Sequence, residues 1–173
     1  MFSDVYMRYR GGCLMLLRRE GDAVVFLGTA FLVHPDGYLL TVAHILPKDG
    51  ALVVSPRDFG AAFGPPESET VPTLPAKVCR VDPEHDVALL SFHREAEITL
   101  PDHVVGMPDG VMPGSGVACL GYPFGFYHVY NQCLYQGVVT AKIESPGGLR
   151  LFLFDARSDE GLRGGPLVDI SDG

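Results

Sequence analysis

The chain has 173 residues, with 13 lysines and arginines against 21 aspartates and glutamates, a formal net charge of −8. This acidic balance disfavours nucleic acid as a partner, because nucleic-acid-binding proteins usually present a basic face. No apolar run approaches the roughly 20 residues needed to span a bilayer, so we expect no membrane segment. Met1–Gly12 also lacks the apolar core of a signal peptide, which predicts a cytoplasmic protein.

Glycine and proline content indicates an all-β fold. The chain holds 21 glycines and 14 prolines, and few stretches follow a helical period, which favours short strands joined by turns. Asp36-Gly37 is a hairpin turn signal, and Ala43–Leu46 is expected to form a single helical turn. In chain order, the expected strands are Cys13–Arg18, Ala23–Val33, Tyr38–Val42, Ala51–Ser55, Ala76–Val81, Asp86–Phe92, Val117–Gly121, Cys133–Glu144, Leu149–Asp155 and Pro166–Ile170. This rhythm alone indicates a barrel or a sandwich.

The cysteines and most of the histidines show no pattern of a metal site. The four cysteines lie in apolar stretches without Cys-x-x-Cys spacing; free buried thiols in a reducing compartment are the prediction, and two structural disulfides are the alternative. They are Cys13, Cys79, Cys119 and Cys133. Five histidines lack metal-ligand spacing, so we expect neither a metal nor a cofactor. They are His34, His85, His93, His103 and His128.

A series of short motifs follows a fixed order along the chain. The segments are GTAFLV at residues 28–33, TVAH at 41–44, HDVALL at 85–90, GYPFG at 121–125, QGVVTA at 136–141 and GLRGGPL at 161–167. Together they resemble the trypsin-like serine protease family, whose members carry a catalytic histidine, an aspartate and a Gly-x-Ser-Gly-Gly-Pro loop in this order. The Gly-x-Pro-x-Gly loop and the later Asp155-Ala156 pair are closest to the HtrA-like bacterial branch. The resemblance runs from about Gly28 to Leu167.

The resemblance implies a role for three side chains. His44 matches the general base, which takes a proton from the nucleophile, and Asp86 matches the carboxylate that orients the imidazole. The nucleophile position holds Arg163 instead of serine. A guanidinium stays protonated at ordinary pH and cannot attack a carbonyl. We therefore expect the site, as written, to lack peptidase activity.

The surroundings of Arg163 also acquire roles by resemblance. The backbone N–H groups of Gly161 and Arg163 would form the oxyanion hole, and Arg157 and Ser158 would line the wall of the substrate pocket. Two orientations of the Arg163 side chain are open. It could pair with Asp86, or it could point to solvent and receive an acidic group.

The family likeness implies two Greek-key β-barrels with the active site in the cleft between them. We expect the first barrel over residues 1–100, a linker over residues 101–116 and the second barrel over residues 117–173. The sequence ends at Gly173, before the pair of strands that would close the second barrel, so that barrel is expected to be incomplete. Further domains after Gly173, or an oligomer, would then cover the exposed edge.

Three functions are compatible with these residues. The first prediction is a pseudoprotease that binds a peptide or protein segment in the cleft between the barrels. The second is an active serine endopeptidase, if the parent protein carries serine at position 163. The third is a structural module of a larger protein.

Overall fold

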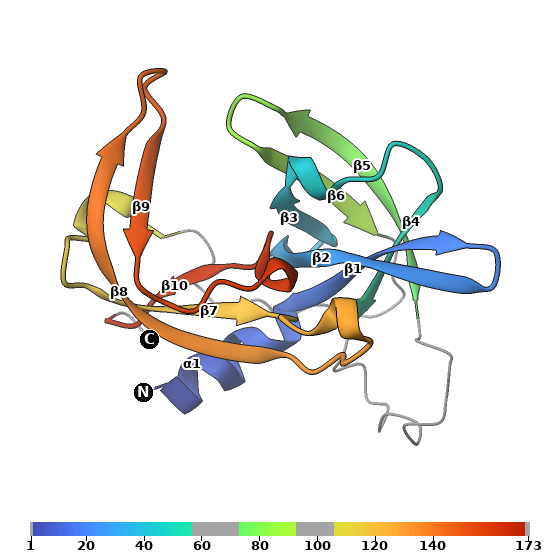
Figure 1. The fold of residues 1–173 in the computed structure, drawn as a ribbon, viewed down its shortest axis with the longest axis horizontal. Helices are drawn as coiled ribbons and strands as arrows, with labels where there is room; N and C mark the ends of the chain where they lie inside the picture. The colour runs from blue at the N-terminus through green and yellow to red at the C-terminus, as the bar shows by residue number, and fades with distance from the viewer. Residues whose placement is uncertain (1, 57–72, 93–105, 172–173) are drawn as a thin grey trace.

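The structure is a computed structural model, in which residues 2–56, 73–92 and 106–171 are described. His93, His103, Gly173 and residues 101–105 of the predicted linker lie outside these ranges. The described residues form two β-sheets that lie side by side (Figure 1), which confirms the all-β prediction. The strands are β1 Cys13–Glu20, β2 Ala23–His34, β3 Tyr38–Val42, β4 Ala51–Pro56, β5 Leu74–Asp82, β6 Val87–Phe92, β7 Gly116–Gly121, β8 Cys133–Glu144, β9 Arg150–Phe154 and β10 Leu167–Asp169.

Helical structure is confined to short elements. They are the helix α1 Phe2–Tyr9 and the 3-10 turns η1 Arg10–Gly12, η2 Ala43–Ile45, η3 Pro108–Gly110, η4 Gly125–Tyr127 and η5 Glu160–Leu162. No helix among the residues placed by the structure is long and apolar enough to cross a membrane.

The first sheet closes into a barrel of six strands, in the order β1-β2-β3-β6-β5-β4. Alternate side chains along its strands point into the interior of the barrel. Leu39 on β3, for example, is paired with Leu90 on β6, and both are fully buried. Every strand of the barrel except β5 contributes fully or nearly fully buried residues to this interior. The apolar side chains of β5 are half-buried or exposed. The buried members of this core are Leu14, Leu16, Ala30, Leu32, Leu39, Val54, Ala88, Leu90 and Phe92.

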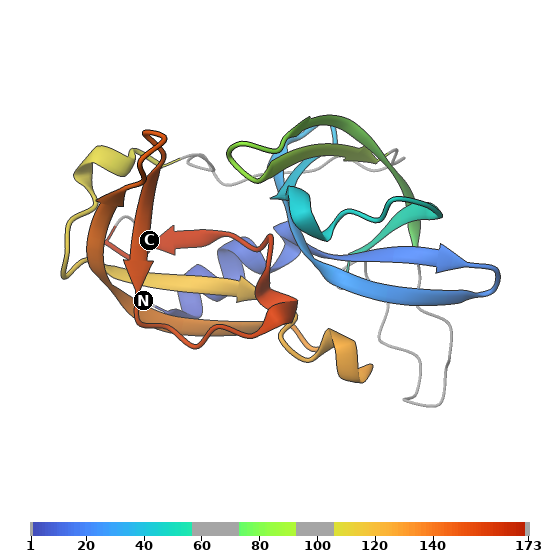
Figure 2. The same ribbon diagram turned by 45° about the horizontal axis from the view of Figure 1, so that its top comes forward.

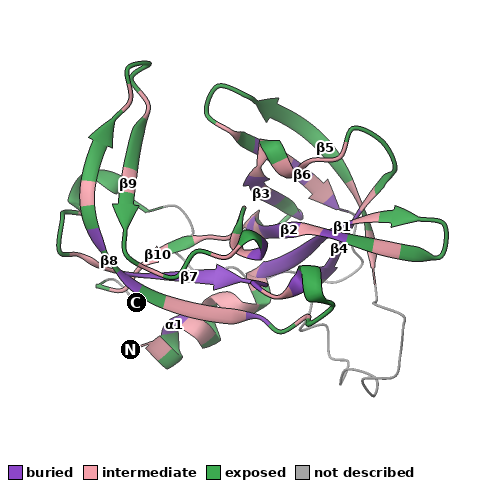
Figure 3. Ribbon diagram, in the orientation of Figure 1, coloured by how far each residue is buried: buried purple, intermediate pink, exposed green. Residues whose placement is uncertain are grey.

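The second sheet has four strands in the order β10-β7-β8-β9 and is open. In the described part of the chain, β9 and β10 each have one neighbouring strand, so both form edges of the sheet. Apolar side chains are exposed along β9, at Leu151, Leu153 and Phe154, and Figure 3 shows this strand as mostly exposed while β7 is buried. The expected incomplete second barrel is therefore seen as an open sheet.

The helix α1 was not predicted, and it packs against the second sheet although it precedes the first barrel in the chain. Figures 1 and 2 both show it beside β7. Val5 of α1 is fully buried in one cluster with Ala118 and Leu120 of β7 and Met15 of β1. Because this cluster draws on both sheets, the two halves share part of their core.

The cysteines are thiols in this structure, and none of the four pairs with another. Burial raises the pKa of Cys13 to about 12 and that of Cys119 to about 11. The expected burial holds for Cys13 and Cys119, whereas Cys133 is half-buried and Cys79 lies exposed on β5 with its Sγ 3.1 Å from the hydroxyl of Ser91.

Candidate active site

His44 and Asp86 meet because β3 and β6 are paired. Val42 at the end of β3 faces Val87 at the start of β6, so the residues that follow β3 lie beside the residue that precedes β6. The amide of Ala43 donates to the carbonyl of Asp86 at 3.1 Å, and the amide of His44 donates to Asp86 Oδ1 at 2.9 Å. The imidazole Nδ1 of His44 lies 2.6 Å from Asp86 Oδ2. The backbone amide and the imidazole of His44 therefore both hold the Asp86 carboxylate in place.

The tautomer of His44 follows from this contact. An ionised carboxylate only accepts hydrogen bonds, so Nδ1 is the donor and Nε2 of the neutral ring carries the lone pair. An imidazole held in this way can accept a proton at Nε2. The pair is half exposed, with side-chain accessibilities of 50% for His44 and 45% for Asp86.

Asp86 has a left-handed backbone conformation, with a φ of 53°. Aspartate and asparagine adopt this conformation more readily than other residues with a side chain. Partial burial raises the pKa of the Asp86 carboxyl, but hydrogen bonds from the imidazole and the amide of His44 outweigh this effect, and the pKa lies below its usual value. The carboxylate form is thus favoured in the folded protein.

Asp86→Asn is expected to destabilise the fold at neutral pH and to have little effect at acid pH. Because the folded-state pKa is depressed, the stabilisation by the carboxylate is present above the unfolded value of 3.8 and is lost as the pH falls through the lower folded value. Asparagine keeps the left-handed backbone, so the substitution tests the charge.

Urea unfolding at neutral pH, and at an acid pH below the depressed folded-state pKa of Asp86, measures this difference between the wild type and the variant. Asp22→Asn, in the exposed turn between β1 and β2, is the control and should change little at either pH. A loss of stability in Asp86→Asn that does not depend on pH would contradict the prediction.

The segment that carries Arg163 is held by Thr29 of β2. The Thr29 amide donates to the carbonyl of Arg163 at 2.9 Å, and its hydroxyl donates to the carbonyl of Gly161 at 2.7 Å. The Thr29 hydroxyl also accepts from the amide of Tyr122 at 3.2 Å, and Thr41 Oγ1 donates to the carbonyl of Thr29 at 2.7 Å. Sequence reasoning assigned no role to either threonine, although a fully buried hydroxyl such as that of Thr29 needs a partner.

The glycines of this segment allow it to lie against the first barrel. A Cβ at Gly164, whose φ is +86°, would lie 2.1 Å from the carbonyl oxygen of Thr29 and 2.2 Å from Thr41 Oγ1. A Cβ at Gly28 would meet both Ile45 and the carbonyl oxygen of Arg163. Since Ile45 directly follows His44, the segment approaches the strand end that supplies the histidine. Figure 1 shows the same approach, with the red turn before β10 next to β2.

Arg163 is exposed and pairs with a residue of its own turn. Its Nη2 lies 3.4 Å from Oε1 of Glu160, whereas the carboxylate of Asp86 contacts His44. Among the described residues no ion pair joins Arg163 to Asp86. Of the two orientations left open by the sequence, the pairing of the arginine with Asp86 is therefore wrong.

One of the two amides predicted for the oxyanion hole is already engaged. The N–H of Arg163 donates to the carbonyl of Glu160 at 3.1 Å and closes the turn η5. Gly161 is buried in this turn, and a Cβ there would lie 2.0 Å from the carbonyl oxygen of Tyr122. In this conformation the Arg163 amide serves the turn instead of an incoming oxyanion.

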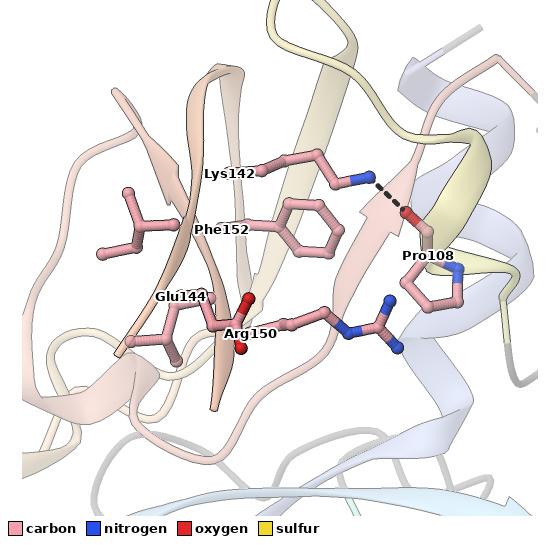
Figure 4. Close-up of a pocket in the computed structure, with 7 residues that line it drawn as sticks. Pro108, Lys142, Glu144, Arg150 and Phe152 are labelled. Carbon is pink, nitrogen blue, oxygen red and sulfur yellow. Dashed lines mark hydrogen bonds between the residues drawn. The ribbon is translucent and has the colours of Figure 1, made fainter. Parts of the chain in front are cut away.

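A separate hollow of about 290 Å³ lies at the far end of β8 and β9. Figure 4 shows Lys142 donating to the carbonyl of Pro108, at 3.1 Å, beside the ring of Phe152. Arg150 pairs with Asp109 at 2.9 Å. These contacts attach the described part of the predicted linker to the second sheet, and none of the predicted site residues lines the hollow.

Comparison with known proteins agrees with the motif order and the fold. The trypsin-like peptidase domain family matches residues 28–173. The chain is 31% identical over 147 residues to a probable periplasmic serine endoprotease, DegP-like, of Ectopseudomonas mendocina. The matched region covers 83% of this chain and 27% of that protein. The same values hold for the protein of this name from Pseudomonas fulva. The chain thus spans about a quarter of the length of these relatives.

A solved structure shows the fold independently. An HtrA-type protease, AlgW with a decapeptide, superposes with a TM-score of 0.77 over 98% of this chain and 55% of that chain, at 22% sequence identity. Because the family model matches residues 28–173 and the DegP-like relatives are 31% identical over 83% of the chain, this chain belongs to the trypsin-like peptidase domain family.

Proposed function

We propose that this domain binds a peptide or protein segment next to His44 without cleaving it. The observation that carries the proposal is Arg163, which occupies the position of the nucleophile while the His44–Asp86 contact of 2.6 Å is intact. A protonated guanidinium offers no lone pair for attack. The engaged amide of Arg163 also removes one donor that would stabilise an oxyanion.

Neither Ser158 nor a cysteine near position 163 offers a substitute for the serine. Ser158 is exposed and lies on the segment between β9 and η5, before the turn that carries position 163. The segment 155–171 contains no cysteine. A nucleophile requires a base within hydrogen-bond reach, and no hydrogen bond joins Ser158 to His44 in the part of the chain that the structure describes.

The unmodified chain is expected to show no labelling by a fluorophosphonate probe and no hydrolysis of casein. The probe reacts with an activated hydroxyl, and position 163 supplies none. Gel fluorescence after incubation with the probe measures this directly. Labelling of the unmodified chain that disappears in His44→Ala would contradict the proposal, because it would reveal a nucleophile that uses this histidine.

An active serine endopeptidase is the second candidate, for a parent protein that carries serine at position 163. The intact contact between His44 and Asp86 favours it. Arg163→Ser tests this candidate with the same probe. Labelling in that variant, and its loss on adding His44→Ala, would support it.

The location and the wider assembly are also proposals. The cytoplasmic location stays a prediction, and the names of the DegP-like relatives, which call them periplasmic, favour the periplasm. Release of the protein by osmotic shock of the cells that make it would decide between the two.

Two further predictions remain. One is a partner strand at the edges of the second sheet, from further chain or from another copy. The other is the role of a purely structural module.

A further inference from the structure

Arg157 is held in a defined position on the predicted wall of the substrate pocket. Its guanidinium carbon lies 5.7 Å from the centre of the Phe124 ring and 5.8 Å from that of Tyr135. Its Nε lies 2.9 Å from Oδ2 of Asp159, an ion pair with a buried oxygen rather than an aligned hydrogen bond. Cation–π contacts of this kind fix a guanidinium that would otherwise be mobile.

One strand of the second sheet and two connections bring these residues together. Tyr135 lies on β8, Phe124 precedes η4, and Asp159 directly precedes η5. The segment that carries Arg157 packs closely against β8. A Cβ at Gly137 of β8 would lie 2.8 Å from the Cβ of Ala156, the residue before Arg157. The cluster therefore adjoins η5, the turn that carries Arg163 at its end.

The guanidinium still has donors to offer. Only Nε takes part in the ion pair with Asp159, and no described residue forms a hydrogen bond or ion pair with the two terminal nitrogens. The side chain is 61% exposed, so these nitrogens are open to a ligand. A fixed planar guanidinium matches the two oxygens of a carboxylate, and little side-chain entropy remains to be lost on binding.

Charge in the neighbourhood does not block such a ligand. Besides Asp159, the carboxylates nearest in sequence are Asp155, which accepts from the amide of Val138 at 2.7 Å, and Glu160, which contacts Arg163 at 3.4 Å. Each acid of this stretch therefore has a partner already, a backbone amide for Asp155 and an arginine for Asp159 and Glu160. Arg157 combines an aromatic platform with terminal nitrogens that no described residue occupies.

We infer that Arg157 receives a carboxylate of the bound segment, so that this site selects peptides with an acidic group. The inference rests on the proposed peptide binding. The carboxylate comes from an acidic side chain or from a free C-terminus, because both present the same pair of oxygens.

Fluorescence anisotropy with three pools of short labelled peptides tests the inference. The pools are random except for one fixed position, which holds glutamate in an amidated peptide, glutamine in an amidated peptide, or glutamine in a peptide with a free C-terminus. For an exposed pair we expect the wild type to bind one carboxylate pool about twofold to fivefold more tightly than the amidated glutamine pool. The pool that gains affinity identifies the source of the carboxylate.

Arg157→Met should abolish this preference while binding of the amidated glutamine pool persists. Arg150→Met removes an arginine that is exposed to a similar degree at the far end of β9, and this variant should keep the preference. Equal weakening of all pools in Arg157→Met, or equal binding of all pools by the wild type, would overturn the inference and leave peptide binding intact. Failure of every pool to bind the wild type would overturn the proposed function itself.

A measurement on the wild type guards against misfolding of the Arg157 variant. The preference for the carboxylate pool should shrink as salt is raised, because ions screen an exposed pair. A preference that does not respond to salt would also overturn the inference.

Discussion

Tyr122→Ala is expected to lower the free energy of unfolding by about 3–5 kcal/mol, the range for truncating a large buried aromatic side chain. Tyr122 is fully buried in the cluster that joins the two sheets. Its hydroxyl donates to the carbonyl of Cys13 on β1 at 3.1 Å, and its amide donates to Thr29 on β2 at 3.2 Å. The truncation therefore leaves a cavity and an unpaired carbonyl at the junction. Urea unfolding monitored by circular dichroism measures the loss.

Two further variants separate the contributions of Tyr122. Tyr122→Phe keeps the ring and should lose about 1 kcal/mol for one buried hydrogen bond. Tyr127→Ala is the control, because Tyr127 is 77% exposed and should change stability by less than about 0.5 kcal/mol. A change in Tyr122→Ala no larger than that of Tyr127→Ala would show that the junction does not depend on this ring.

Gly161→Ala is expected to destabilise the protein by about 3 kcal/mol, at the upper end of the usual range for overpacking. The new Cβ would lie 2.0 Å from the carbonyl oxygen of Tyr122, and a backbone atom cannot move aside as a flexible side chain can. The turn η5 must shift, and the hydrogen bond from Thr29 to the Gly161 carbonyl is lost or lengthened.

Thermal unfolding, together with the peptide anisotropy described above, measures both consequences of this shift. Gly110→Ala is a matched control, because no atom lies within 4 Å of the added Cβ. Stability of Gly161→Ala equal to that of Gly110→Ala would contradict the close packing of the turn.

Much of the fold could be predicted because apolar alternation and turn residues are local signals. The strands Tyr38–Val42 and Cys133–Glu144 have the predicted bounds. Leu39 and Thr41 alternate with half-exposed or exposed neighbours, as expected for a strand with one buried face. The order of motifs also predicted that His44 and Asp86 would be close, and in the structure Nδ1 of His44 lies 2.6 Å from Oδ2 of Asp86.

Other features depend on contacts that no local pattern reveals. The helix α1 is too short for a helical period to stand out, and it depends on β7 for burial of Val5. The pairing of Arg163 with Glu160 and the closure of η5 by the Arg163 amide depend on the conformation of one turn. The network around Thr29 joins residues far apart in the sequence, so it is visible only in three dimensions.

The packing of α1 against β7 has a consequence for the order of events on the ribosome. The helix leaves the exit tunnel before β7, and β7, which contributes Ala118 and Leu120 to the cluster around Val5, is made only after the entire first barrel. During that interval Val5 lacks its neighbours on β7, and an isolated helix of this length is at best marginally stable in water. Nascent chains arrested before β7 should thus expose the N-terminal segment to protease, and chains arrested after it should protect it.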